Sequence, residues 1–145
     1  MRVLFDTNVV LDVLLNRQPH AMAAAQLMAY VEQRRLQGLV AATSVTTIHY
    51  LATRAVGSAG AKRHVEALLS LFDVAAVDRK VLSDALPLSF PDYEDAVVHE
   101  AARHAGATGI VTRDQEGFVK ATLPIYRPDE LLTMLQALGS PQSGE

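Results

Sequence analysis

The sequence predicts an α/β protein with three layers, α/β/α, in which helices cover both faces of a mostly parallel central sheet. Two observations lead to this fold class. Short apolar runs alternate with longer helical segments along most of the chain. The chain also has 145 residues, 50% of them hydrophobic, which is enough for one domain with its own core. We expect a single domain over residues 1–138 and a flexible tail over residues 139–145, because that end has nothing to bury.

The first half of the chain is expected to contain two strands and four helices. The apolar run at residues 2–5 predicts a strand that stops at Asp6, and residues 39–42 predict the second. Gly38 is expected to end the long helix before it, because glycine adopts the left-handed cap at low cost. Either Thr43 or Ser44 can cap the helix that follows. The helices are expected over residues 9–15, 20–37, about 44–55 and 61–71, with a turn at 57–60.

The second half predicts three more strands and three helices. Asp78 is expected to cap a helix that ends near Leu86, and Asp92 a helix that ends near Ala105. Pro128 is expected to begin a last helix, up to residue 138. The strands are expected over residues 72–77, 109–112 and 124–126. Ligands of such sheets bind beyond the carboxyl ends of the strands, so a site is expected there.

The composition excludes several classes of function. Lys and Arg number 13 against 16 Asp and Glu, a formal net charge of −3, so a polybasic tail is not the basis of function. The absence of cysteine excludes disulfide frameworks, thiolate zinc sites and cysteine nucleophiles. No apolar run approaches the ~20 residues of a membrane span, and Asp6 comes too early for a secretory signal. We therefore expect a cytoplasmic protein that does not bind a membrane.

Three carboxylates stand where the predicted topology can bring them together. Asp6 and Asp114 follow strands, and Asp95 lies in the first turn of the helix capped by Asp92. Each has an ordinary alternative as a helix cap, a first-turn acid or a turn residue. Converging carboxylates repel one another unless a cation neutralises them. An all-oxygen site favours Mg²⁺ or Mn²⁺, and such a site predicts phosphodiester hydrolysis by a metal-activated water.

Three short motifs follow one another along the chain. They read V-L-F-D-T-N-V-V-L-D at residues 3–12, F-P-D-Y-E-D-A at residues 90–96 and I-V-T-R-D at residues 110–114, continuing to Phe118. In order and spacing they resemble the motifs of the PIN domain, a family of metal-dependent ribonucleases that includes the VapC-type toxins. The resemblance extends from Arg2 to about residue 135 and implies a PIN-like nuclease fold.

The resemblance also implies a role for each motif residue. The catalytic metal ligands would be Asp6, Asp95 and Asp114, and Asp92 would be an accessory carboxylate. The side chains that support this cluster through hydrogen bonds would be Thr7, Asn8 and Thr112.

Two positions depart from the family pattern. The family usually supplies a glutamate from the helix after the second strand, and His49 falls nearest that position. His49 is expected either to touch a metal, a water or a phosphate, or to be a packed and hydrogen-bonded neighbour. Many relatives carry an acid where this chain has Gly117; either Glu116 substitutes for it, or the site holds a single ion. Both departures bear on catalytic strength rather than on the fold.

Basic residues are unevenly distributed along the chain. Five basic residues and no acid occur between residues 34 and 64, whereas acids dominate residues 78–100. An acidic centre beside a basic rim suits a phosphate backbone that crosses a metal site. Arg113, which adjoins Asp114, and Arg54 are the strongest candidates for RNA binding. The histidines other than His49 are expected at the surface or in capping positions; they are His20, His64, His99 and His104.

The residues and the resemblance together predict an endoribonuclease that uses Mg²⁺ or Mn²⁺ and is the toxin of a toxin–antitoxin pair. The expected partners are an RNA substrate, a cognate antitoxin protein and a second copy of the chain. Several Ala-, Leu- and Met-rich helices are more apolar than one small core requires, which favours the dimer. Two alternatives stay open: a weak or inactive PIN-like module that binds RNA or a partner, and an aspartyl-phosphate phosphatase with Asp6 as phosphate acceptor.

Overall fold

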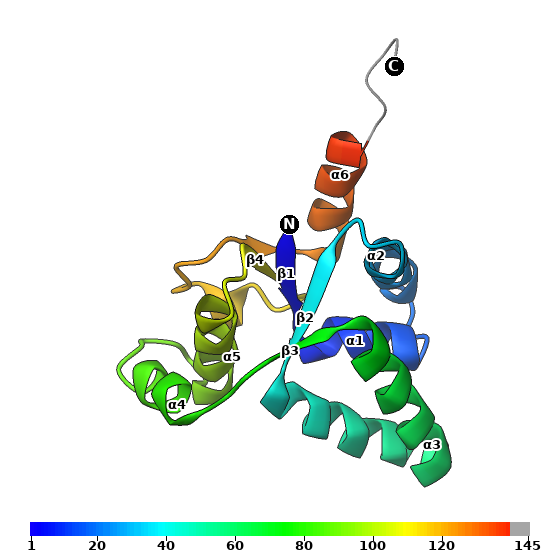
Figure 1. Cartoon of the computed structure of the whole chain (residues 1–145), viewed down its shortest axis with the longest axis horizontal. Helices are drawn as coiled ribbons and strands as arrows, with labels where there is room; N and C mark the ends of the chain where they lie inside the picture. Colours follow the sequence, from blue (N-terminus) through cyan, green and yellow to red (C-terminus); the bar gives the residue numbers. More distant parts are fainter. Residues whose placement is uncertain (140–145) are drawn as a thin grey trace.

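The computed structural model of the chain describes residues 1–139, which contain one sheet of five parallel strands (Figure 1). The strand order is β3-β2-β1-β4-β5, and Leu4 of the central strand lies opposite Leu39 of β2 and Ile110 of β4. Because all the strands run in one direction, their carboxyl ends share one edge of the sheet. The strands are β1 Arg2–Phe5, β2 Gln37–Ala41, β3 Asp73–Ala75, β4 Gly109–Val111 and β5 Ile125–Tyr126.

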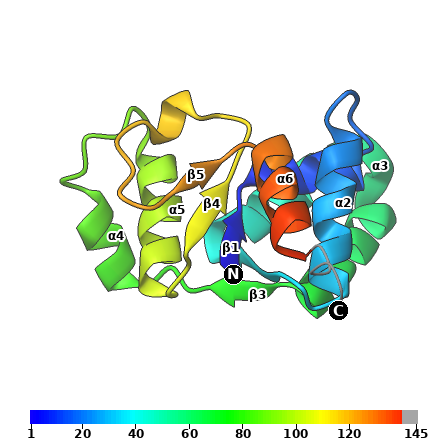
Figure 2. The same ribbon diagram turned by 90° about the horizontal axis from the view of Figure 1, so that it is seen from above.

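Helices cover both faces of the sheet, which confirms the predicted three-layer α/β/α fold. Four helices, α1, α2, α3 and α6, pack on one face, whereas α4 and α5 pack on the other (Figure 2). A short 3₁₀ helix, η1, follows β4. The bounds are α1 Thr7–Leu14, α2 Ala21–Glu32, α3 Ala42–Leu71, α4 Arg79–Ala85, α5 Tyr93–His104, η1 Glu116–Phe118 and α6 Pro128–Gly139.

The sheet separates two apolar cores, because successive strand residues point to opposite faces. Val3 and Phe5 of β1 are buried against α1, α2 and α6, whereas Leu4 between them is buried against α5. Both cores consist of aliphatic side chains and phenylalanines. Among the helices of residues 1–139, none has the length and apolar character needed to cross a membrane.

Two predicted helix caps are confirmed. The carboxylate of Asp78 accepts a hydrogen bond from the backbone N–H of Val81, and that of Asp92 accepts one from Glu94. The break predicted at residues 57–60 is present as a kink at Gly57, whose φ of 84° and ψ of 170° are not helical, so α3 consists of two helical segments that meet there. A positive φ of this kind is readily adopted by glycine.

Three local predictions are wrong. Helix α2 ends at Glu32 rather than at residue 37, and the chain turns at Arg34, whose φ is 59°. Gly38 belongs to β2, where a Cβ atom would lie 2.6 Å from a ring carbon of Phe72, so close packing requires glycine there. Neither Thr43 nor Ser44 caps α3, which begins at Ala42 without a side-chain cap.

His99 is also not the surface or capping residue that was expected. Its side chain is buried, and its Nδ1 lies 2.8 Å from a carboxylate oxygen of Glu100. Its Nε2 accepts hydrogen bonds from the backbone N–H groups of Thr122 and Leu123. The ring therefore attaches α5 to the segment that leads into β5. Of the tail predicted over residues 139–145, Gly139 ends α6 and the rest lies outside the described residues.

Candidate active site

Asp6 stands at the carboxyl end of the central strand and is buried. It is the N-cap of α1, where its Oδ1 accepts a hydrogen bond from the backbone N–H of Thr7. Its other oxygen, Oδ2, accepts a hydrogen bond of 2.8 Å from the hydroxyl of Thr112. The cap that was predicted as the alternative to a site is therefore present, but it occupies only one of the two carboxylate oxygens.

Asn8 and Thr112 join the ends of β1 and β4 around Asp6. The side-chain amide of Asn8 donates to the Thr112 hydroxyl at 3.2 Å and to Asp6 at 3.5 Å. The hydroxyl of Thr112 in turn accepts a hydrogen bond from the backbone N–H of Asp114. These bonds fix the Asp6 carboxylate relative to the loop that carries Asp114, which is the arrangement expected for supporting residues.

Asp95 and Asp114 meet at Gly117. Helix α5 brings in Asp95 in its first turn, and the loop after β4 brings in Asp114, whose Oδ1 accepts a hydrogen bond from the Gly117 N–H. A Cβ atom on Gly117 would lie 2.6 Å from Oδ2 of Asp95 and 2.7 Å from Oδ2 of Asp114. Both carboxylates therefore turn toward the same point, and the glycine leaves them the room to do so.

Electrostatics show that Asp6 belongs to the same cluster. Burial raises the pKa of Asp6, and the charges of Glu94 and Asp114 raise it further, whereas its hydrogen bonds to Thr112 and Thr7 act in the opposite direction. Burial also raises the pKa of Asp95 to about 7 from its ordinary value of 3.8, assisted by repulsion from four acids: Asp6, Asp92, Asp114 and Glu94. Asp92, which was predicted to be an accessory carboxylate, is exposed, and its charge raises the pKa of Asp95.

Among the described residues, no cationic side chain pairs with this acid cluster of Asp6, Asp95 and Asp114. Within residues 1–139, none of the ion pairs involves any of the three. Carboxylates without a cationic partner, among them Asp6 and Asp95 with raised pKa values, offer only oxygen donors and fit a hard divalent cation. The three do not form a group whose ligand atoms all lie within 4.8 Å of one another.

The raised pKa of Asp95 predicts a pH dependence. In the folded, metal-free protein Asp95 stays protonated up to about pH 7, whereas in the unfolded chain it loses its proton near pH 4. The free energy of unfolding therefore falls as the pH rises from 4 through 7. A bound cation must displace the same proton, so apparent Mn²⁺ affinity should rise about tenfold between pH 6 and pH 8. Calorimetric titration at both pH values measures it; Asp95→Asn should flatten this rise, and an equal rise in that variant would contradict the prediction.

Asp12 is a functional candidate that the sequence did not reveal. It is fully buried in α1 and is held by two arginines: Arg17 donates to its Oδ1 at 2.9 Å, and Arg113 donates to both oxygens at 2.6 and 3.2 Å. The backbone N–H of Arg113 also donates to Asn8. Arg113 is therefore fixed next to the acid cluster, with its side chain directed toward α1.

Three other predicted site residues form no hydrogen bond or ion pair with the acid cluster among residues 1–139. His49 is exposed on α3, and its side chain forms no hydrogen bond in that part of the chain, so the expected packed neighbour is not observed. Arg54 is exposed, and its guanidinium lies 5.8 Å from the ring centroid of Tyr50. Glu116 is exposed at the start of η1. Ligation by His49 or Glu116 stays a prediction.

A second charged cluster lies between α4 and α5. Asp84, Glu100 and His104 offer ligand atoms within 4.8 Å of one another. However, Nη2 of Arg103 contacts all three, at 3.3, 2.8 and 3.3 Å, so a guanidinium already supplies the positive charge. We interpret this cluster as an ion-pair network that attaches α4 to α5.

Solved structures share this fold at low sequence identity. The chain is similar to VapBC2 from Rickettsia felis, solved with promoter DNA, with a TM-score of 0.69 and 12% identity over 88% of this chain and 98% of that one. It is similar to VapC20 from Mycobacterium tuberculosis, described as a toxin that cleaves the sarcin–ricin loop, with a TM-score of 0.60 and 14% identity over 74% and 86% of the two chains.

A protein from Pyrobaculum aerophilum is similar with a TM-score of 0.63 and 22% identity over 94% of this chain and 90% of that chain. At these identities the likeness establishes the fold. No curated protein matches the chain by sequence. The sequence model of the PIN domain, in contrast, matches residues 2–116 and so spans the acid cluster up to Glu116. This chain therefore belongs to the PIN domain family.

Proposed function

We propose that this chain is a metal-dependent endoribonuclease that hydrolyses phosphodiester bonds in RNA. The observation that carries the proposal is the convergence of Asp6, Asp95 and Asp114 at the carboxyl edge of the sheet without a neutralising side chain. Mg²⁺ or Mn²⁺, held by these three carboxylates, would supply an activated water and stabilise negative charge on the phosphate oxygens. We place this activity in the cytoplasm.

The chain's own residues set the geometry of that reaction. Thr112 and Asn8 orient the Asp6 carboxylate through hydrogen bonds, and the N–H of Gly117 orients Asp114. Preorganised carboxylates need little rearrangement when they bind a cation, which is an advantage in catalysis. No side chain of the cluster has to act as a covalent nucleophile.

Cleavage of single-stranded RNA by the purified chain tests the proposal. We expect cleavage with Mg²⁺ or Mn²⁺ and none with a chelator. RNA that stays intact in both metals, across substrates of mixed sequence, would contradict the assignment.

We further propose that the chain acts as a toxin with a cognate antitoxin protein as its partner. The similar solved structures include toxin–antitoxin complexes, one of them from Klebsiella pneumoniae with a TM-score of 0.66 and 19% identity, covering 87% of this chain and 97% of that one. Expression of the chain alone should arrest growth, and Asp6→Asn should relieve the arrest.

A homodimer is the expected oligomeric state. Helix α3 exposes apolar side chains along its length, among them Tyr50, Leu51, Val56 and Leu69, and a second copy of the chain would cover some of them. Light scattering at micromolar concentration should give twice the mass of the chain. A monomer under those conditions would contradict the dimer.

A second candidate function is an RNA-binding PIN module with little or no cleavage activity. It is favoured by the chain's own departures from the motif, since His49 and Gly117 supply no acid. It predicts that RNA binds the chain but is not cut when Mn²⁺ is added. The cleavage assay above separates the two candidates.

His49→Ala is expected to lower cleavage by no more than about tenfold, or ~1.4 kcal/mol. The reason is that the side chain is exposed and forms no hydrogen bond with the acid cluster among the described residues. Steady-state cleavage rates of the variant and the wild type measure the effect. A loss as large as that caused by Asp6→Asn would assign His49 to the metal centre.

A further inference from the structure

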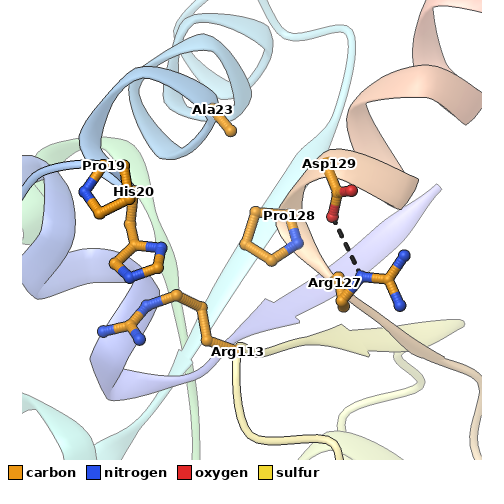
Figure 3. A pocket seen from close by; sticks show the side chains of 7 residues that line it. All are labelled: Pro19, His20, Ala23, Arg113, Arg127, Pro128 and Asp129. Carbon is orange, nitrogen blue, oxygen red and sulfur yellow. Dashed lines mark hydrogen bonds and ion pairs between the residues drawn. The ribbon is translucent and has the colours of Figure 1, made fainter.

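A cleft of about 310 Å³ opens beside Arg113 (Figure 3), the residue that precedes Asp114 of the acid cluster. Pro19 and His20 form one wall at the start of α2, and Pro128 forms the opposite wall at the start of α6. Ala23 of α2 lies between these walls. The surface of the cleft is mostly apolar, and its charged groups stand at its ends.

The cleft and the acid cluster lie at the same edge of the sheet. Arg113 follows β4 and Arg127 follows β5, and both strands are parallel to β1, which ends at Asp6. The consecutive residues Arg113 and Asp114 turn in different directions: the Arg113 side chain pairs with Asp12 of α1, and the Asp114 carboxylate lies against Gly117. Because Arg113 lines the cleft and Asp114 is the next residue, a nucleic-acid strand held at Asp114 would lie beside the cleft.

Arg113 contributes positive charge on one side of the cleft. Among residues 1–139, Asp12 is the only carboxylate paired with Arg113 and Arg17, so two guanidinium groups share a single negative charge. Within residues 1–139, Nη1 of Arg113 has no hydrogen-bond partner, because its contacts with Asp12 use Nε and Nη2. In contrast, Arg127 at the other end is paired with Asp129 and Glu130. The available positive charge is therefore on the side of the acid cluster.

The shape and chemistry of the cleft match a nucleotide. The ring of His20 lies beside the Arg113 guanidinium, and proline rings line the two walls (Figure 3). Bases of single-stranded RNA stack on flat side chains such as His and Arg, and arginine binds phosphate through parallel N–H groups. A nucleotide whose base lies between the apolar walls and whose phosphate lies toward Arg113 would use both the flat side chains and the guanidinium.

We propose that this cleft binds one nucleotide of a single-stranded RNA, adjacent to the phosphodiester held at the acid cluster. The base lies between the proline walls beside His20, and Arg113, positioned by Asp12, binds the neighbouring phosphate. This inference rests on the proposed function, because it takes RNA as the ligand.

Filling the cleft tests the proposal without changing any charge. Ala23→Leu places a larger side chain in the cleft, whereas Ala25→Leu adds the same atoms at an exposed position of α2 outside it. Leucine is a good helix former, so both variants should fold, and equal melting temperatures check this. The probe is a fluorescent single-stranded RNA of random sequence, and anisotropy measures its binding. Every protein also carries Asp95→Asn, which prevents cleavage.

We expect Ala23→Leu to weaken RNA binding by about tenfold or more, the effect of losing one stacked base, and Ala25→Leu to leave it unchanged. RNA with 5-iodouridine should also crosslink, on irradiation, to the peptide that contains His20. If RNA does not bind the parent protein, or binds both leucine variants equally well, the cleft is not a nucleotide site. If the wild-type chain fails to cleave RNA but binding remains sensitive to Ala23→Leu, the endoribonuclease assignment fails and the nucleotide site stands.

Discussion

Replacing Asp6 with asparagine is expected to abolish RNA cleavage while leaving the metal-free fold as stable as the wild type or more stable. Asparagine keeps the shape and one oxygen, which can accept the Thr7 hydrogen bond. Its amide group would face the Thr112 hydroxyl, which can accept a hydrogen bond instead of donating one. The substitution also removes one charge from the cluster. Burial and neighbouring acids raise the pKa of Asp6, so its charged form is disfavoured in the metal-free protein. Removing that charge should stabilise the fold by on the order of 1 kcal/mol.

Melting curves and one cleavage assay measure this effect. Mn²⁺ should raise the melting temperature of the wild type through binding linkage and hardly change that of Asp6→Asn. Asp78→Asn is the matched control, because Asp78 is also the N-cap of a helix but lies on α4. Asparagine caps a helix about as well as aspartate, so the control should cleave RNA and respond to Mn²⁺ like the wild type. If Asp6→Asn behaves like this control, Asp6 is only a helix cap.

The sheet and the acid cluster could be predicted because their cause is local and repeated. A short apolar run that ends in an acid places that acid at the carboxyl end of a strand, and parallel strands bring such ends to one edge. Asp6 and Asp114 follow this rule. Asp95 required one further step, since its place in the first turn of α5 depends on the cap at Asp92, which the structure confirms.

Features that depend on residues far away in the sequence were not predicted, or were predicted wrongly. Gly38 follows a helical pattern and reads as a C-cap, but the ring of Phe72, far along the chain, is what excludes a side chain there. His99 lies amid a buried stripe that includes Val98 and Ala102, and this pattern could have indicated burial. The orientations of His49 and Arg54 depend on how α3 is rotated against the sheet, which sequence periodicity does not determine.

The pairing of Asp12 with Arg113 joins residues 101 positions apart. In the sequence, Asp12 is one acid within an apolar helix, and nothing near it identifies the partner. Its burial and its two arginines make it the residue outside the acid cluster whose replacement should have the largest effect.

Asp12→Asn is expected to destabilise the fold by about 2–3 kcal/mol. The carboxylate is fully buried, and its two oxygens accept hydrogen bonds from Arg17 and Arg113. Asparagine has only one side-chain oxygen to accept them. Its amide N–H groups would face a guanidinium, which also donates. Arg113 and Arg17 are 31% and 39% exposed, so both can turn partly toward water, which limits the loss.

The matched control is Asp129→Asn, which removes the same kind of charge from an exposed pair with Arg127. Exposed ion pairs contribute little, so this control should lose less than about 0.5 kcal/mol. Thermal unfolding should show a decrease of about 5–10 °C for Asp12→Asn and almost none for the control. Below the melting temperature, Asp12→Asn should also bind RNA more weakly, because Arg113 loses the carboxylate that positions it beside the cleft. Equal and small shifts in the two variants would show that the buried pair contributes no more to stability than a surface one.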